Sequence, residues 1–174
     1  MLSQSVKDFL QKLDQETLEK CLIARDMAIS YEKYIDSQTT LLSDSAAVYD
    51  IGMSYISHNL KNKTTALMQC ERELLDYHSY MGYQLLKEMG EKEEVCQMIL
   101  FHHSLNPVML EEIPKCLPEV MEKRKTLFCI DAFIGLTSKR PYRDSFSSYQ
   151  ACELIEKTSN KDKQFLEFVK EYFY

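Results

Sequence analysis

Three of the four histidines in this chain stand where they could bind a metal ion. His78 lies among apolar residues with helical spacing, and the adjacent pair His102 and His103 ends another apolar helical stretch. A buried imidazole needs a hydrogen-bond partner or a metal ion, because an unpaired polar group in a core costs free energy. Asp50 and Asp131 also stand beside apolar residues, where a carboxylate is rarely left unpaired. These five side chains are therefore candidate metal ligands.

Histidine and carboxylate together suit zinc, iron or manganese. Three histidines and one aspartate would satisfy a single divalent ion, so we expect one ion rather than two. Each histidine could instead be a structural residue held by a hydrogen bond, and Asp131 could be the ion-pair partner of a nearby arginine. Residue type and spacing leave both interpretations open.

Helical periodicity of apolar residues recurs along the whole chain, which predicts an all-α fold of about seven helices in one compact domain. Only four glycines and four prolines are present, and this favours helices over turn-rich sheets. Residues 1–40 are expected to form N-terminal helices of this domain, and residues 41–174 its core and C-terminal helices.

The candidate histidines fall on the apolar stripes of two predicted helices. The first spans residues 67–89, and its stripe contains His78. The second spans residues 91–103, and its apolar stripe ends at His102. The side chain of His103 points roughly a hundred degrees away from that of His102 around the helix axis. The apolar members of the first stripe are Leu67, Cys70, Leu74, Met81 and Leu85.

The candidate aspartates fall on two further predicted helices. Asp50 belongs to one that starts at about Ser45, after a polar loop at residues 37–44. Asp131 belongs to one that spans residues 119–136. Inward positions elsewhere are expected at Leu18, Leu22, Ala28 and Tyr31, and near the C-terminus at Phe165, Phe168, Val169 and Tyr172. A capping box is expected at Ser147 and Gln150.

Composition excludes several classes of function. The formal net charge of −6 argues against duplex nucleic acid as a partner, because such binders need a basic surface. We expect no signal peptide and no membrane-spanning segment, since no apolar stretch is long enough. The six cysteines are dispersed without CxxC spacing, so we expect free thiols and a cytoplasmic protein.

The stretch DAFIGLTSKRPYR, residues 131–143, closely resembles the DxFDALTSxRPYR segment of HD-GYP domains. These domains are the all-helical branch of the HD phosphohydrolases that hydrolyses cyclic di-GMP. Three shorter segments also resemble family motifs: YDIGM at 49–53 resembles HDIGK, HSYMGYQLL at 78–86 resembles HPxxGAxxL, and HHS at 102–104 resembles HHE. The resemblance covers about residues 46–157, and LTSxRPYR is its most specific part.

The resemblance implies a defined set of metal ligands. In the family, the HD aspartate and three later histidines hold one metal ion, and they correspond here to Asp50, His78, His102 and His103. Asp131 corresponds to the late aspartate that helps to hold the other metal ion. One half of a two-metal centre is therefore complete in this chain.

The resemblance also implies roles in catalysis. Asp50 would bind and orient the metal, and Asp131 would accept a proton from the attacking water. Arg140 and Arg143 would bind the substrate, because a guanidinium matches a phosphate group in a bidentate manner. The ligand would be a cyclic dinucleotide or another phosphodiester.

The chain also departs from the family pattern. Tyr49 replaces the HD histidine, Met53 replaces the lysine that faces the phosphate, and Ser104 replaces the glutamate of HHE. The GYP motif and the upstream histidine are missing as well. The other metal site has therefore lost its histidines. Lys61 and Lys63 are expected to be solvated loop charges.

Two functions follow from these matches and departures. The first is a divergent, metal-dependent phosphohydrolase, related to cyclic di-GMP phosphodiesterases, with reduced or altered activity. The second is a catalytically inactive HD-GYP-like module that senses a nucleotide or binds a protein. The aromatic C-terminal helix could contact a regulatory protein or a second copy of the chain in a homodimer, although such a helix usually packs on its own domain.

Overall fold

A computed structural model describes residues 1–105, 112–139 and 143–173. All regular elements in these ranges are helices and no β-strand is among them, which confirms the all-α prediction. The elements are α1 (Gln4–Leu10), α2 (Gln15–Tyr34), α3 (Leu41–Ala46), the 3-10 helix η1 (Ile51–Tyr55), α4 (His58–Lys61), α5 (Gln69–Asp76), α6 (His78–Glu88), α7 (Glu93–Phe101), α8 (Pro118–Thr137), α9 (Ser148–Glu156) and α10 (Lys163–Tyr172).

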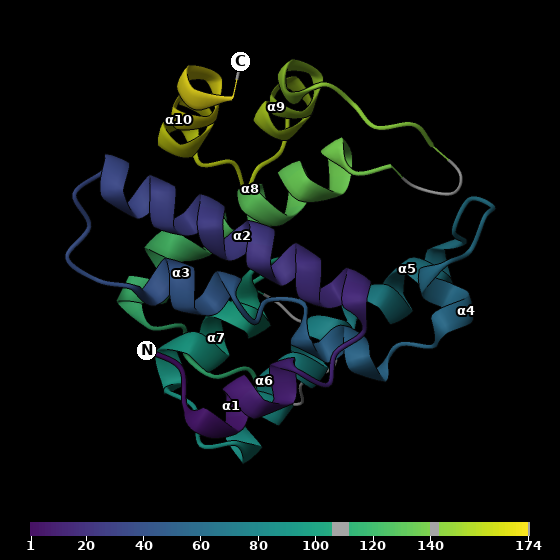
Figure 1. Ribbon diagram of the computed structural model, residues 1–174, viewed down its shortest axis with the longest axis vertical. Coiled ribbons are helices and arrows are strands. Elements are labelled where there is room, and N and C mark those ends of the chain that lie inside the picture. Colours follow the sequence, from purple (N-terminus) through teal and green to yellow (C-terminus); the bar gives the residue numbers. More distant parts are fainter. Residues whose placement is uncertain (106–111, 140–142, 174) are drawn as a thin grey trace.

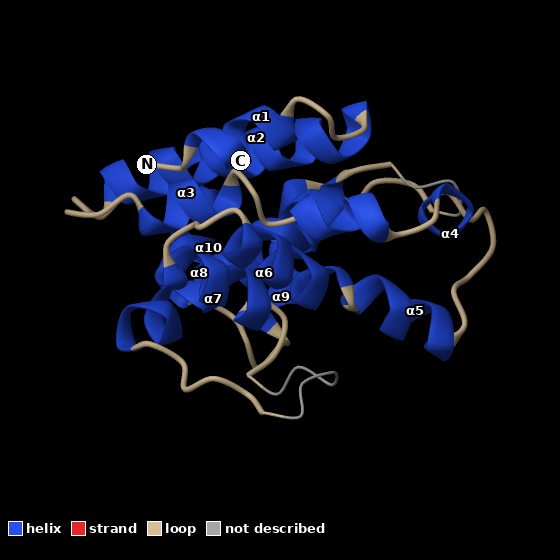
Figure 2. Cartoon of the chain, turned by 90° about the horizontal axis from the view of Figure 1, so that it is seen from below, coloured by secondary structure: helices blue, strands red, loops and turns tan. Residues whose placement is uncertain are grey.

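Helix α7 lies at the centre of the fold. Every residue from Val95 to Phe101 is buried, and α7 contacts α3, α6 and α8. The long helix α2 crosses the molecule and packs on α3 and α8 (Figure 1). Helices α9 and α10 pack on each other and on α8 at one end, while α4 and α5 lie together at another side (Figure 1, Figure 2).

One hydrophobic core extends from Val6 in α1 to Val169 in α10. The inward positions expected at His102, Phe165, Phe168 and Val169 are confirmed, and the core around the centre also contains Val95, Met98, Ile99, Leu127, Ile130, Phe133 and Ile134. Two expected inward positions, Leu22 and Tyr172, are wrong because both side chains are exposed. Ala28 and Tyr31 are confirmed as buried, and the buried stripe of α2 also contains Cys21 and Ala24. Its small side chains allow neighbouring helices to approach α2 closely.

Helix α3 begins earlier than the sequence indicates. Residues 41–44 were expected to be a loop, but they form the first part of α3, and Asp50 lies in a turn after it. The cause is Glu32 of α2, whose buried carboxylate accepts hydrogen bonds from the backbone N–H groups of Leu42 and Ser43 at 3.1 and 3.3 Å. The first N–H groups of a helix have no intrahelical partner, so a carboxylate there stabilises the helix start.

The long helix expected over residues 67–89 is interrupted at Tyr77, giving α5 and α6. Nδ1 of His78 hydrogen-bonds to the Leu75 carbonyl oxygen, and the Ser79 hydroxyl donates to the Asp76 carbonyl oxygen. Side chains that bind nearby carbonyl groups compete with the helical ladder and so favour a break. The break also explains why Leu74, expected on a buried stripe, is exposed.

Other local predictions are confirmed. Ser147 and Gln150 form the expected capping box at the start of α9. All six cysteines are free thiols. A membrane-spanning segment would have to be longer and more apolar than any helix that the described residues form.

Candidate metal centre

The five candidate ligands meet at the junction of four segments. Asp50 precedes η1, and His78 is the first residue of α6. His102 directly follows α7, His103 comes next, and Asp131 lies in α8. Asp50, His78 and His102 are buried, whereas His103 and Asp131 are partly exposed. The structure thus brings all five together.

Among the five candidate ligands, the three histidines lie closest together, and we call them the histidine cluster. One potential ligand atom from each of His78, His102 and His103 lies within 4.8 Å of the other two. The ring centroids of His102 and His103 are 3.9 Å apart, and the His78 centroid lies 5.4 and 5.2 Å from them. Two carboxylates flank the rings: Asp50 Oδ1 is 3.5 Å from His78 Nε2, and Asp131 Oδ2 is 3.9 Å from His103 Nε2.

Backbone hydrogen bonds determine the tautomer of two of the histidines. Nδ1 of His78 lies 2.6 Å from the Leu75 carbonyl oxygen, and Nδ1 of His102 lies 2.7 Å from the Ile99 carbonyl oxygen. A carbonyl oxygen only accepts, so Nδ1 carries the proton in both rings. In the neutral ring Nε2 therefore has a free lone pair. Metal-binding histidines commonly make this hydrogen bond, which orients the ring.

The Nε2 atoms of His78 and His102 are buried without a hydrogen-bond partner in the part of the chain that the structure describes. An unsatisfied buried acceptor costs roughly 1–3 kcal/mol. His78 Nε2 also approaches the Asp50 carboxylate at 3.5 Å, and two acceptors repel each other unless a proton or cation lies between them. A divalent cation would bind the unsatisfied Nε2 atoms and would remove the repulsion between His78 Nε2 and the Asp50 carboxylate. These residues therefore fit a metal ion.

Burial keeps two of the imidazoles neutral. Burial, together with the neighbouring His78 and against the opposing hydrogen bond to Ile99, lowers the pKa of His102 to about 3. Burial also lowers the pKa of His103 well below its ordinary value, with His102 and His78 acting in the same direction. Neutral imidazoles are the form that binds metal, and together with carboxylates they suit zinc, iron or manganese.

Tyr49 occupies the sequence position at which the family resemblance expects a histidine. Its side chain is buried, and its ring centroid lies 6.2 Å from that of His102. Burial raises the pKa of Tyr49 well above its ordinary value, and the carboxylates of Asp50 and Asp131 raise it further. Tyr49 therefore remains a neutral phenol near neutral pH and does not replace the imidazole that a second metal ion would need.

The histidine cluster opens onto a pocket of about 220 Å³, which we call the cluster pocket. Four of the candidate ligands line it, namely Asp50, His78, His103 and Asp131. Met53 also lines it, and so do Leu60, Leu67, Leu75 and Asp76. A small molecule in this pocket would contact the candidate metal ligands directly.

Three lysines from separate segments complete the lining of the cluster pocket: Lys20 of α2, Lys61 of α4 and Lys63 after α4. Their side chains are only 16, 15 and 27 % exposed, in that order. The prediction that Lys61 and Lys63 are solvated loop charges is therefore wrong, and the sequence did not single out Lys20 at all. Nothing local marks these lysines, because their proximity depends on the fold, which brings Lys61 of α4 to Asp14 at the start of α2.

Arg143 is not among the described residues that line the cluster pocket. Its guanidinium donates to the carbonyl oxygens of Leu136 and Gly135 at 3.1 and 2.9 Å, and it lies over the Phe146 ring at 4.6 Å from the centroid. These bonds satisfy carbonyl groups at the C-terminal end of α8, so the guanidinium acts as a helix cap. Arg140, the other predicted substrate ligand, lies outside the described residues.

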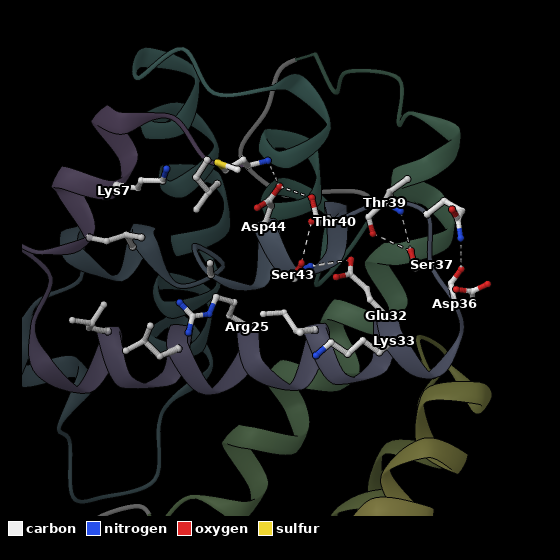
Figure 3. A pocket seen from close by; sticks show the side chains of 18 residues that line it. Lys7, Arg25, Glu32, Lys33, Asp36, Ser37, Thr39, Thr40, Ser43 and Asp44 are labelled. Carbon is white, nitrogen blue, oxygen red and sulfur yellow. Dashed lines mark hydrogen bonds and ion pairs between the residues drawn. The ribbon is translucent and has the colours of Figure 1, made fainter.

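A larger groove of about 730 Å³ lies elsewhere, between α1, α2 and α3 (Figure 3). It combines apolar side chains with Lys7, Arg25 and Lys33, and near it Glu32 accepts the backbone hydrogen bond of Ser43 (Figure 3). None of the five candidate metal ligands lines this groove. This groove is therefore larger than the cluster pocket but lacks its chemically distinctive residues.

No model of a known protein family matches this chain, and a search of curated proteins returns no similar sequence. A function must therefore be argued from the geometry of the histidine cluster and from the residues that surround it.

Proposed function

We propose that this chain binds one divalent ion of iron, manganese or zinc through His78, His102, His103 and Asp50. We further propose that it is a divergent HD-GYP-like phosphohydrolase, related to cyclic di-GMP phosphodiesterases, with reduced or altered activity. The observation that carries the proposal is the pair of buried Nε2 atoms of His78 and His102, which lack a hydrogen-bond partner in the described ranges and converge on His103.

The two aspartates would have different roles. Asp50 is buried beside His78, which suits a metal ligand that also orients the ring. Asp131 is partly exposed and lines the cluster pocket, which suits a residue that accepts a proton from water. A bound divalent ion would polarise a phosphoryl oxygen and lower the pKa of a water.

Reduced activity is proposed because this chain lacks the histidine ligands of one of the two metal ions in the family's centre. Tyr49 offers a neutral phenol in place of an imidazole, and Met53 offers no charge to a phosphate. Two-metal sites stabilise both the attacking and the leaving oxygen, so a centre with one ion loses part of that stabilisation.

The same two residues favour a second candidate function. A chain that keeps one set of metal ligands but lacks a catalytic histidine and lysine could serve as a catalytically inactive module. It would then sense a nucleotide or contact a regulatory protein. Metal binding is common to both candidates, and hydrolysis separates them.

The experiment is elemental analysis of protein purified without chelator, followed by assays of cyclic di-GMP and p-nitrophenyl phosphate hydrolysis with iron, manganese or zinc. We expect about one ion per chain. The variants His102→Ala and His103→Ala should lose most of this metal. His58→Ala is the matched control, because His58 is the fourth histidine and is exposed outside the cluster.

Folded protein without bound metal would overturn the metal proposal, and so would unchanged metal content in both cluster variants. Bound metal with hydrolysis of either ester would support the phosphohydrolase. Bound metal without any hydrolysis would reject the phosphohydrolase in favour of the inactive module. Circular dichroism of each variant establishes that it is folded before its metal content is compared.

A further inference from the structure

We infer that Lys20, Lys61 and Lys63 bind a single phosphate group in the cluster pocket. This inference rests on the proposed function and specifies its substrate class. The substrate would be a phosphomonoester or another small phosphorylated compound, and not an intact cyclic dinucleotide.

The burial of these lysines is the first reason. The side chains of Lys20 and Lys61 are only 16 and 15 % exposed, so these charged groups have lost much of their solvent and depend on polar partners. They come from α2 and α4, and Lys63 follows α4, so three separate positions supply ammonium groups to one pocket. That pocket is also the one that reaches the histidine cluster.

The second reason is that each ammonium group retains hydrogen-bond donors. A lysine has three N–H donors. Each of these lysines has one carboxylate partner, and none of the partners lines the cluster pocket. The pairs are Lys20 with Glu16 at 2.5 Å, Lys61 with Asp14 at 2.8 Å, and Lys63 with Glu71 at 2.6 Å. The ion pairs orient the lysine side chains. Because partly exposed ion pairs contribute little free energy, the paired carboxylates would compete only weakly with a phosphate for the ammonium groups.

Charge in the cluster pocket is the third reason. The carboxylates of Asp50 and Asp131 belong to the proposed metal centre, whose ion would offset their charge. Asp76 is the one further acidic residue among those described in the lining, against three lysines. Each lysine is also paired with a carboxylate outside the pocket, so an anion beside the metal centre would be held by the remaining N–H donors of the lysines and by the metal ion, and not by an excess of positive charge.

The size of the pocket selects the kind of phosphate compound. Its volume of about 220 Å³ is below the roughly 300–1,000 Å³ of pockets that enclose drug-sized ligands. A neighbouring pocket of about 260 Å³ shares Lys20, Lys61, Asp50 and Met53, and its lining also contains the carboxylates of Asp14 and Glu16 beside the neutral polar residues Gln15, Thr17 and Asn62. The phosphate would lie between the lysines and the metal centre, and the alcohol part of a small ester could extend toward this polar lining.

The test is isothermal titration calorimetry of inorganic phosphate into the metal-loaded chain. We expect Lys20→Met, Lys61→Met and Lys63→Met each to weaken phosphate binding about tenfold, because each removes a charge-assisted hydrogen bond. Metal content should stay unchanged in all three variants. Lys33→Met is the matched control, since Lys33 lies on α2 with Lys20 but lines the larger groove.

A second variant separates binding from folding. Asp14→Asn removes the ion pair of Lys61 while Asn still caps α2, because asparagine is a good N-cap residue. We expect Asp14→Asn to bind phosphate at least as tightly as the unaltered chain. Weakened binding in Asp14→Asn to the same extent as in Lys61→Met would show that the ion pair matters only for structure, and would overturn the inference.

The remaining outcomes distinguish this inference from the proposed function. Bound metal with equal phosphate affinity in all three lysine variants would overturn the phosphate site and leave the metal centre intact. Protein without metal would overturn the proposed function, and the same titration on metal-free protein would still test the lysines. Phenyl phosphate should displace phosphate, and displacement by cyclic di-GMP at equal concentration would overturn the size argument.

Discussion

At the scale of single residues, the candidate centre depends on imidazoles held in the neutral form. Burial and, to a smaller extent, the neighbouring His78 lower the pKa of His102 from the ordinary value of 6.5 to about 3. The pKa of His103 is lowered by burial and by both other rings of the histidine cluster. His102 and His103 can therefore each offer a lone pair at neutral pH without first losing a proton.

This burial predicts how stability depends on pH. In the unfolded chain these histidines take up protons below about pH 6.5, whereas folded His102 stays neutral down to about pH 3. The metal-free protein should therefore lose stability as pH falls below 6.5, by about 1.4 kcal/mol per pH unit for each such histidine. Denaturant unfolding with EDTA at about pH 7.5 and about pH 5 measures this loss.

Two variants assign the pH effect to the cluster. His102→Gln cannot be protonated, so its loss of stability between the two pH values should be smaller than that of the unaltered chain. His58→Gln, at an exposed position, should behave like the unaltered chain. An identical pH dependence in all three proteins would contradict the neutral state assigned to His102.

At the scale of elements, the centre depends on how closely η1 approaches α6. A Cβ atom on Gly52 would lie 1.9 Å from the His78 carbonyl oxygen and 2.6 Å from the Gly82 amide nitrogen. The backbones of the two elements therefore touch, and no side chain fits between them. This contact places Asp50, two residues before Gly52, beside the imidazole of His78.

Gly52→Ala should therefore separate η1 from α6. The atoms that a methyl group would meet are backbone atoms, which cannot rotate away, so we expect a loss of more than about 3 kcal/mol in the free energy of unfolding. Metal affinity should fall together with stability, because Asp50 moves away from His78. Chemical denaturation and metal titration measure the two effects.

Gly90→Ala is the control for this substitution. Gly90 has a φ of +69° and no atom within 4 Å of an added Cβ, so its substitution introduces backbone strain without a clash. It should cost about 1 kcal/mol and leave metal affinity unchanged. If Gly52→Ala bound metal as tightly as Gly90→Ala, the contact between η1 and α6 would not determine the position of Asp50.

At the scale of the whole molecule, the candidate ligands connect parts of the chain that are far apart. They come from the turn before η1, from α6, from the end of α7 and from α8. The backbone carbonyl of His103 also accepts a hydrogen bond from Asn160 at 2.9 Å, in the turn between α9 and α10. An ion bound here would tie the central helices together and so favour the folded state as a whole.

Metal binding should therefore raise the melting temperature of the entire domain. A ligand at about a hundred times its Kd adds about 2.7 kcal/mol of stability, which for a chain of this size corresponds to a rise of roughly 5–10 °C. Thermal melts with zinc, manganese or iron, and again with EDTA, measure the effect. His103→Ala should show no rise, and a rise of equal size in that variant would place the bound metal elsewhere.

The sequence by itself was enough to predict the helical fold and the identity of the candidate ligands. Apolar periodicity is a local property, and it correctly indicated the buried faces of α7 and α8. The histidines were recognisable because imidazoles on an apolar stripe require a partner wherever the stripe is buried. Both inferences need only residues that are neighbours along one helix.

Only the tertiary structure decided the start of α3, the break between α5 and α6, and the lysines of the cluster pocket. Glu32 lies in α2 and stabilises the start of α3 by accepting a backbone hydrogen bond there. Lys20 lines the same pocket as Lys61 and Lys63, although some forty residues separate them in the sequence. Arg143, which the motif suggested for substrate binding, donates hydrogen bonds to carbonyl oxygens at the end of α8. The contacts of Glu32 and of the three lysines join residues that are distant in sequence, and their free energy depends on packing that local propensity does not encode.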